Sequence, residues 1–318
     1  MCLRTPEEVD VQPSLFGAEE PEDPREARLR LPTGAVRMTI PTPRGPLAAT
    51  AVGMDSAAEW FCFVPGYLSS KEDFYAVMSE LAGRGSGAVA FDLRGQQESG
   101  SARNPQDCSL EAMAADACAV AEQVRSRWSI GSGHLVGHSL GGLIAQEATT
   151  SCEWASVTLL CSGPAALPTH RAGVFPLIRR FLPVVDRDVL WERKLGLERA
   201  AGTRGASPAV AEFERTRWGD YDSTALDEGA RILLETGPIH PPSPPPPLLV
   251  AWGEHDDGWP IEQQRELAAR WKGRTVVIPD VGHQPQLDDP GALARVLVED
   301  RASGVTGPGC PGLSGNAG

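Results

Sequence analysis

Short apolar runs alternate with amphipathic stretches along most of the chain. The runs have the continuity of strands buried on both faces, and the stretches between them repeat apolar residues at helical spacing. Such alternation implies βαβ units, so we predict an α/β fold with a mostly parallel sheet and helices on both faces. The predicted strands are residues 36–42, 47–53, 60–66, 87–95, 133–139, 155–163, 248–253 and 275–280, and the predicted helices between them are residues 71–85, 109–128, 140–152, 261–271 and 291–302.

The alternation stops after the sixth predicted strand. Residues 164–240 show helical patterns only, for example at 175–196 and 223–237, and the alternation resumes after a proline-rich segment that starts at 241. A helical insertion between two late strands is most simply a cap over the carboxyl edge of the sheet, where open α/β sheets bind ligands. We therefore predict a core of residues 31–163 and 241–302 and a helical cap of residues 164–240.

The two ends of the chain differ from this core in composition. Residues 1–30 are acidic and poor in apolar residues, which predicts a loosely ordered arm, and residues 303–318 are rich in Gly, Pro and Ser, which predicts a disordered tail. The first 30 residues lack the apolar core of a secretory signal, and no stretch approaches the roughly 20 apolar residues of a membrane-spanning helix. We expect a cytoplasmic protein with no membrane partner.

Net charge and cysteine content limit the partners, metal sites and compartment that we expect. A net charge of −13 opposes binding to nucleic-acid phosphates, so we expect no nucleic-acid partner. The seven cysteines include no C-x-x-C pair and no cluster at metal spacing. We therefore expect free, buried thiols in a reducing compartment and no metal site. Scarce lysine beside 34 Gly and 28 Pro is typical of a GC-rich bacterial source.

The segment from Gly137 to Gly141 fits the pattern G-x-S-x-G, with Ser139 between a predicted strand and a predicted helix. A serine on such a tight turn has a strained backbone, and the glycines two positions before and after it let the chain pass itself. The helix that follows directs its positive end at the site. The alternative is a small residue in a glycine-rich loop, but the flanking strand and helix favour a nucleophile.

A nucleophilic serine needs a base that is held in place by an acid. His283 follows the last predicted strand and so reaches the carboxyl edge of the sheet, which makes it the best candidate base among the six histidines. Asp256 and Asp257 follow the preceding strand and are the candidate acids, with Asp256 favoured. The resulting chain order, Ser then Asp then His, is the order expected for a serine on a strand-to-helix elbow.

Acyl transfer at such a serine also needs two main-chain N–H donors for the developing oxyanion. The residue after the nucleophile, Leu140, supplies the first. The loop after the third predicted strand supplies the second, and there Tyr67, which follows Gly66, is the natural donor through its main-chain N–H.

These segments resemble the α/β-hydrolase superfamily, in particular its capped serine hydrolases of the esterase, lactonase and haloperoxidase-like group. "GHSLGG", "DLRGQQESG", "LLVAWGEHDDGWP" and "VGHQPQLDDP" match the family's nucleophile, post-fourth-strand, acid and histidine segments in that order. The resemblance covers residues from about 35 to 300. It implies an eight-stranded, mostly parallel sheet, a Ser139-Asp256-His283 triad and no metal or organic cofactor.

Two short segments depart from the family pattern. Pro65-Gly66 stands where the family usually has His-Gly, and Gly95-Gln96-Gln97 stands where it usually has Gly-His-Gly. Proline can still pre-set a turn, so we expect the oxyanion site to persist with a different hydrogen-bond network around it. The serine at 139 argues against the family's dehalogenases and epoxide hydrolases, which use aspartate there.

The residues together predict hydrolysis of a carboxylic ester, thioester or lactone with a largely apolar acyl group, by a monomer or homodimer. The same triad could instead serve an acyltransferase, a cyclase or a carbon–carbon hydrolase, and a third possibility is a non-catalytic ligand-binding module. In the cap, Phe181, Trp191 and Trp218 are candidates to line an apolar pocket, although packing of the cap helices is the simpler explanation for such residues.

Overall fold

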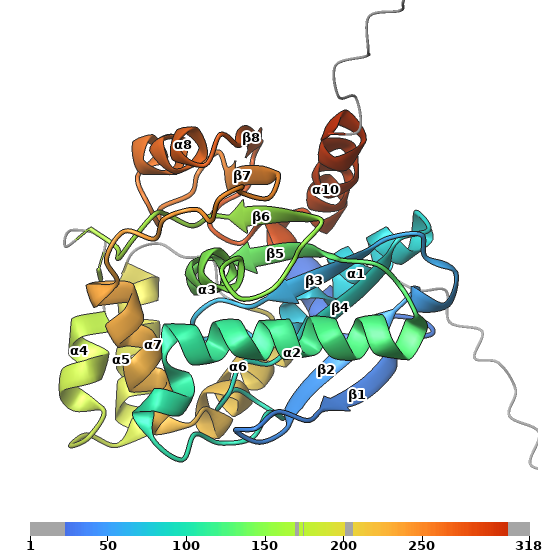
Figure 1. Ribbon diagram of the computed structural model, residues 1–318. Helices are drawn as coiled ribbons and strands as arrows, with labels where there is room; N and C mark the ends of the chain where they lie inside the picture. The colour runs from blue at the N-terminus through green and yellow to red at the C-terminus, as the bar shows by residue number, and fades with distance from the viewer. Residues whose placement is uncertain (1–22, 169–171, 174, 201–205, 305–318) are drawn as a thin grey trace, which may run out of the picture.

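An eight-stranded sheet with the order β1-β2-β4-β3-β5-β6-β7-β8 forms the centre of the structure. The computed structural model describes residues 23–168, 172–173, 175–200 and 206–304 (Figure 1). The β1/β2 and β2/β4 pairs are antiparallel and the other pairs are parallel, which confirms the predicted α/β fold. The strands are β1 (Val36–Ile40), β2 (Leu47–Val52), β3 (Trp60–Val64), β4 (Gly87–Phe91), β5 (His134–His138), β6 (Ser156–Leu160), β7 (Leu248–Gly253) and β8 (Arg274–Ile278).

The central strands are buried along their whole length because their sequences are continuous apolar runs. Their parallel register brings the following loops together at one edge of the sheet. Val64, at the end of β3, pairs with Gly137 of β5, and Gly253, at the end of β7, pairs with Ile278 of β8. The loops that contain Tyr67, Ser139, Asp256 and His283 therefore all start from this carboxyl edge.

Helices cover both faces of the sheet (Figure 1). α2 and α3 contact each other on one face, and α1 and α10 contact each other on the other. α2 begins at a helix cap, where the Ser109 hydroxyl accepts a hydrogen bond from the Ala112 N–H. The helices of the core are α1 (Tyr75–Gly83), α2 (Leu110–Trp128), α3 (Leu140–Ala148), α8 (Ile261–Arg270), α9 (Pro285–Asp288) and α10 (Pro290–Gly304), with short 3-10 turns η1 (Pro24–Leu29), η2 (Met54–Ser56), η3 (Lys71–Phe74) and η4 (Pro105–Cys108).

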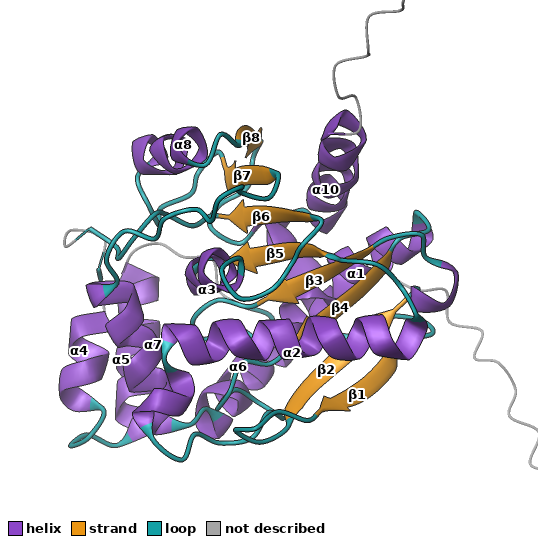
Figure 2. Ribbon diagram, in the orientation of Figure 1, coloured by secondary structure: helices purple, strands orange, loops and turns teal. Residues whose placement is uncertain are grey.

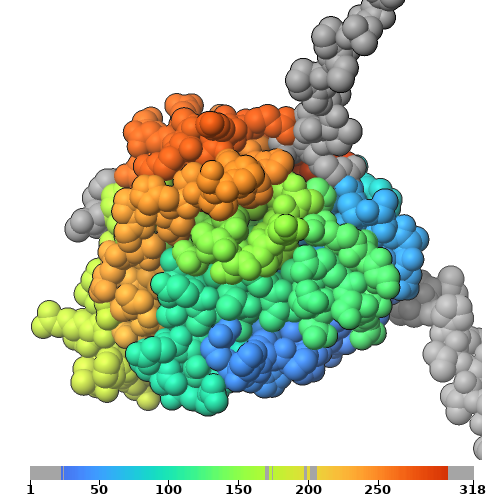
Figure 3. Space-filling view, in the orientation of Figure 1, coloured from blue at the N-terminus to red at the C-terminus, as the bar shows by residue number. Residues whose placement is uncertain are grey.

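Within the described residues, four helices lie between β6 and β7, in the segment where the sequence predicts helices only. They are α4 (Phe175–Phe181), α5 (Arg187–Ala200), α6 (Pro208–Asp220) and α7 (Ser223–Glu235). Figure 2 shows that the arrows of β5 and β6 point toward the side of the molecule where α4, α5 and α7 gather. α7 contacts η4, and in the space-filling view orange atoms lie against turquoise atoms on this side of the molecule (Figure 3). The predicted stretch 175–196 is two helices because Pro183 follows α4.

The last residues of the predicted N-terminal arm differ from the expectation of loose order. Residues 1–22 lie outside the described residues, but Pro24–Leu29 form η1, which contacts α1, α6 and α9. Arg28 is 2% exposed and donates to Asp73 at 3.0 Å and to Glu214 of α6 at 2.5 Å. The acidic composition of the arm gives no sign of this buried arginine. Its ion pairs connect the arm to the core and to the helical segment. At the other end, α10 continues through Gly304, two residues into the predicted tail.

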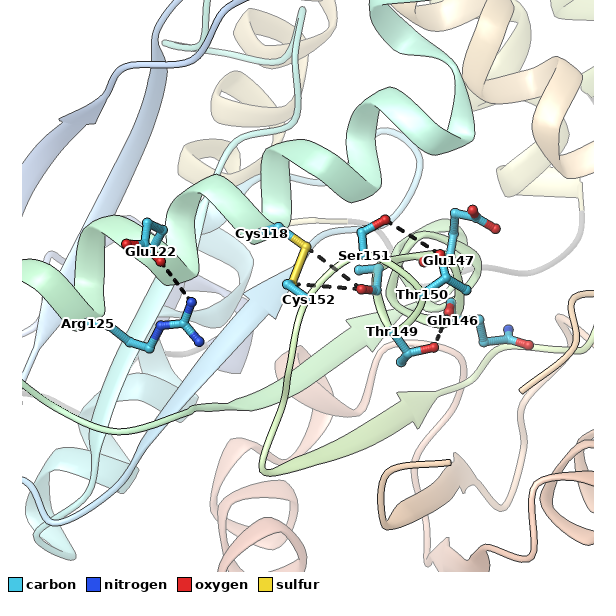
Figure 4. The surroundings of a disulfide bond; sticks show 10 residues. Cys118, Glu122, Arg125, Gln146, Glu147, Thr149, Thr150, Ser151 and Cys152 are labelled. Atoms are coloured by element: carbon cyan, nitrogen blue, oxygen red, sulfur yellow. Dashed lines mark hydrogen bonds and ion pairs between the residues drawn. A yellow bond between two sulfur atoms is a disulfide. The ribbon is translucent and has the colours of Figure 1, made fainter. Parts of the chain in front are cut away.

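A disulfide joins Cys118 of α2 to Cys152, which follows α3 (Figure 4). The prediction that the cysteines are free thiols is therefore wrong for this pair. It is confirmed for Cys62, Cys108 and Cys161, which are free and buried, whereas Cys2 and Cys310 lie outside the described residues. The pair escaped sequence analysis because its members are 34 residues apart and meet only when α2 packs against α3.

Candidate functional site

Ser139 occupies the sharp turn between β5 and α3. Its backbone has φ 53° and ψ −117°, a conformation that residues with a side chain rarely adopt and that stores strain. Two hydrogen bonds hold the turn: the Ser139 N–H donates to the Leu160 carbonyl at 2.9 Å, and the Ser162 hydroxyl donates to the Ser139 carbonyl at 2.8 Å. The strained serine is thus anchored to β6 and the residues that follow it.

The two glycines of the motif are required by close packing. A Cβ on Gly137 would lie 2.2 Å from the Gly141 carbonyl oxygen, and a Cβ on Gly141 would lie 2.2 Å from the carbonyl oxygen of Val64. Neither distance is compatible with a side chain because the obstacle in each case is backbone. The sequence prediction that small residues let the chain pass itself here is confirmed.

His283 lies between Ser139 and Asp256. Its Nε2 is 3.1 Å from the Ser139 hydroxyl oxygen, and its Nδ1 is 2.6 Å from Asp256 Oδ1. Asp256 follows β7 and His283 follows β8, so the parallel register of these strands brings the two side chains together. Of the two adjacent aspartates that the sequence leaves open, the structure brings Asp256 to the histidine.

The Asp256 carboxylate is held at both oxygens. Oδ1 accepts from the Gly258 N–H at 2.9 Å, and Oδ2 accepts from Gln264 Nε2 at 2.8 Å. Burial acts to raise the pKa of Asp256, but the hydrogen bond and charge of His283, with these two donors, lower it below its ordinary value. The group is therefore an ionised carboxylate at neutral pH, and it can stabilise a positive charge on His283.

The loop after β3 runs directly past the nucleophile. A Cβ on Gly66 would lie 3.2 Å from Ser139 Cβ, so the loop and the serine turn pack tightly against each other. The peptide that joins Gly66 to Tyr67 therefore borders Ser139, and Leu140 opens α3 beside it. These are the two positions from which the sequence predicts oxyanion donors.

The Tyr67 side chain extends from this loop into the helical segment. Its hydroxyl donates to the Leu226 carbonyl of α7 at 3.0 Å, and its ring meets the Phe175 ring of α4 edge-on at 5.2 Å. A Cβ on Gly229 of α7 would lie 2.9 Å from the Tyr67 ring, so α7 approaches the loop closely. The helical segment thus covers the residues next to Ser139.

Gln96 lies at the departure from the family pattern after β4 and is fully buried. Its Nε2 donates to the Gly66 carbonyl at 3.2 Å and to the Tyr221 hydroxyl at 2.7 Å, and its Oε1 accepts from the Leu93 N–H at 3.0 Å. The sequence marks this position as unusual but shows nothing of these contacts. They depend on three separate parts of the chain meeting in the fold.

His138 is a second site residue whose contacts sequence reasoning missed. It is 2% exposed, and its Nε2 lies 2.7 Å from the His283 carbonyl oxygen, which makes that nitrogen the donor. Burial, with the nearby His283, lowers the pKa of His138 to about 4. His138 is therefore a neutral residue at neutral pH that holds the main chain of His283.

The pocket candidates of the helical segment have other partners. Trp191 and Trp218 are buried and pack against each other with ring centroids 5.9 Å apart, and Phe181 is 36% exposed beneath the Arg180 guanidinium. Their place in a substrate pocket stays a prediction. Arg179 of α4 forms ion pairs with Asp227 and Glu235 of α7.

Metal-ligating side chains come together in three places among the described residues, but none of these is a closed cation site. One group is Cys161 with the hydrogen-bonded pair Asp256 and His283, and a second consists of the exposed residues Glu254, His255 and Asp280. In the third, Asp92 and two glutamates surround Lys71, whose Nζ lies 2.6 Å from Asp92 Oδ2. The ammonium group already supplies the positive charge that these carboxylates need.

Comparison with known proteins identifies one family and many solved structures with a similar fold. A family model described as "Alpha/beta hydrolase family" matches residues 63–296. An esterase from Thermogutta terrifontis is 20% identical with a TM-score of 0.65, and the match covers 85% of this chain and 98% of that one. An esterase from Exiguobacterium antarcticum is 16% identical with a TM-score of 0.67, covering 83% of this chain and 98% of that one.

An enzyme of another class has the same fold. An epoxide hydrolase from Vigna radiata is 14% identical with a TM-score of 0.65, and the match covers 85% of this chain and 98% of that one. The comparison with curated protein sequences yields no match. At these identities the similar structures establish the fold, and the chemistry has to be argued from the side chains of this chain.

Proposed function

Because the chain belongs to the alpha/beta hydrolase family, we propose that it is a serine hydrolase that cleaves a carboxylic ester, thioester or lactone through an acyl-enzyme. The observation that supports this most directly is the row of hydrogen bonds from Ser139 through His283 to Asp256. A serine, a histidine and a carboxylate in this order are the parts that nucleophilic acyl transfer requires.

In the proposed reaction, the Ser139 oxygen attacks the acyl carbonyl carbon while His283 Nε2 takes the hydroxyl proton. The Asp256 carboxylate stabilises the imidazolium through Nδ1–H. The main-chain N–H groups of Tyr67 and Leu140 bind the oxyanion of the tetrahedral intermediate. His283 returns the proton to the leaving oxygen or sulfur, and a water activated by the same histidine releases the acid and regenerates Ser139.

The nucleophile distinguishes this proposal from the chemistry of the epoxide hydrolase that shares the fold. In the family to which the chain is similar, epoxide hydrolases attack with an aspartate, and this chain has Ser139 there. The second candidate uses the same three residues but another acceptor, as in an acyltransferase or cyclase, or breaks a carbon–carbon bond. Added alcohols or amines would divert product from the free acid if an acceptor other than water resolves the acyl-enzyme.

The helical segment, residues 164–240, is proposed to act as a cap that selects the substrate. Tyr67, Phe175 and Gly229 support this role because they bring α4 and α7 onto the loop beside Ser139. The Tyr67 and Phe175 rings meet there through apolar atoms, which suits a small molecule with a largely apolar acyl group.

One observation concerns membrane-spanning helices, and another concerns the compartment in which the protein lies. No helix within the described residues is long and apolar enough to cross a membrane. The cytoplasmic location expected from the sequence stays a prediction, and the Cys118–Cys152 disulfide argues against it, because disulfides persist mainly in oxidising compartments.

The test is labelling by a fluorophosphonate probe together with hydrolysis of 4-nitrophenyl esters of rising acyl length. Wild type is expected to label and to turn over, whereas Ser139→Ala neither labels nor retains more than about 10⁻⁴ of kcat. Ser126→Ala, at an exposed serine of α2, is the matched control and should behave as wild type. Wild-type protein that fails to label, or label that persists in Ser139→Ala, would overturn the proposal.

A further inference from the structure

Gln96 is a buried side chain that links the loop after β3, the loop after β4 and the helical segment. The Leu93 N–H requires an acceptor, and Gln96 Oε1 provides it at 3.0 Å. This contact fixes the orientation of the amide, because the oxygen must face Leu93 and the NH₂ group must face the other way. Both hydrogens of that group then have acceptors, the Gly66 carbonyl and the Tyr221 hydroxyl.

The Gly66 carbonyl belongs to the same peptide unit as the Tyr67 N–H. A trans peptide is planar, and its C=O and N–H point in opposite directions. A donor that holds the carbonyl oxygen therefore sets the direction of the N–H on the other side of the plane. It also polarises the peptide, which makes that N–H a stronger donor.

We infer that Gln96 is a positioning residue of the oxyanion site: it aims the Tyr67 N–H at the oxyanion by holding the Gly66 carbonyl. The inference rests on the proposed serine hydrolase function. The Ser69 N–H also donates to the Gly66 carbonyl, at 3.3 Å, so loss of Gln96 leaves one restraint on the peptide plane. Gln96 does not itself contact the reacting atoms.

The helical segment takes part through Tyr221. The Tyr221 hydroxyl accepts from Gln96 at 2.7 Å, and the neighbouring Asp222 N–H donates to the Gly95 carbonyl at 2.7 Å. A Cβ on Gly95 would lie 2.5 Å from Ala225 Cβ, so the glycine lets α7 lie against this loop. The helical segment thus helps to hold the Gln96 amide, and the Gln96 amide in turn orients the Gly66–Tyr67 peptide.

The test compares three variants of the full chain in ester hydrolysis. Gln96→Met keeps the shape of the side chain but has no donor, and Tyr221→Phe keeps the ring but removes the acceptor of Gln96. Gln146→Met is the matched control, since Gln146 is an equally buried glutamine of α3 whose Nε2 donates to the Gly142 and Gly163 carbonyls and not to the Gly66 peptide.

Gln96→Met is expected to lower kcat about 10- to 100-fold with KM unchanged within about threefold. This is less than the roughly 10²- to 10³-fold cost of deleting an oxyanion donor, because the Tyr67 N–H is misaligned and not removed. A trifluoromethyl ketone, which forms the same oxyanion on the serine, should bind more weakly by about the same factor as kcat/KM falls. Tyr221→Phe should lower kcat about 3- to 10-fold, and Gln146→Met should not lower it by more than about threefold.

The outcomes separate this inference from the function on which it rests. If wild type hydrolyses esters and labels at Ser139 but Gln96→Met and Tyr221→Phe keep their kcat, the positioning role is refuted and the serine hydrolase stands. The same holds if Gln146→Met lowers kcat as much as Gln96→Met, because the effect would then be general to buried amides. If wild type neither hydrolyses nor labels, the function fails and the positioning role fails with it.

Discussion

Removal of the Cys118–Cys152 disulfide is expected to lower the free energy of unfolding by about 3.8 kcal/mol at 25 °C. The bond joins residues 34 positions apart, and closing a loop of that length removes about 12.6 cal/mol/K of entropy from the unfolded chain. With a urea m-value of about 3 kcal/mol/M, the unfolding midpoint of Cys118→Ala/Cys152→Ala should fall by roughly 1.3 M. Ester hydrolysis at 25 °C should not change, since Ser139 and Cys152 lie at opposite ends of α3.

The assay is urea unfolding followed by circular dichroism, with and without dithiothreitol. Reductant should move the wild-type midpoint to that of the double variant and should expose two additional titratable thiols per chain. Cys108→Ala, which removes a free buried thiol, is the matched control and should still respond to reductant as wild type does. Equal midpoints for wild type and the double variant without reductant would show that the cross-link does not constrain the unfolded chain.

Substitutions at one buried carboxylate and at two glycines test further contacts of the structure. Burial acts to raise the pKa of Asp73, but the charges of its two buried arginine partners lower it below the ordinary value, so its stabilisation is present above about pH 4 and is lost as pH falls through the lowered pKa. Asp73→Asn should therefore lower unfolding free energy by about 3–5 kcal/mol at pH 7 in urea titrations, and a difference that does not shrink below pH 4 would contradict this. In thermal unfolding, Gly229→Ala should destabilise the protein by about 1–3 kcal/mol because its Cβ would press on the Tyr67 ring. Gly219→Ala, which has open space around it, should stabilise the protein by up to about 1 kcal/mol. Equal effects of the two substitutions would refute the steric argument.

Much of the fold could be predicted because apolar periodicity is a local property. The central strands lie where continuous apolar runs predict them, and the predicted helix at 175–196 breaks at Pro183, a residue whose effect is itself local. The three residues Ser139, Asp256 and His283 could be predicted from the sequence for a related reason. Each follows a predicted strand, and parallel strands present their carboxyl ends at one edge.

The remaining features depend on contacts between distant parts of the chain. The sequence favours Asp256 over Asp257 without excluding the latter, and the turn after β7 decides which carboxylate faces His283. The contacts of Gln96 require three segments to meet, and one of them belongs to the helical insertion. The buried Arg28 lies within an acidic segment whose composition predicts no packing, so its partners could not be inferred from pattern.

The position of Arg28 bears on where the cooperative folding unit of this protein begins. The match to the family starts at residue 63, and β1 starts at residue 36. A chain trimmed to either point would lack the guanidinium that binds Asp73 and Glu214, and it would leave Asp73 buried with one cation fewer. Studies that shorten this protein should therefore keep η1, so that Asp73 retains both of its buried arginine partners.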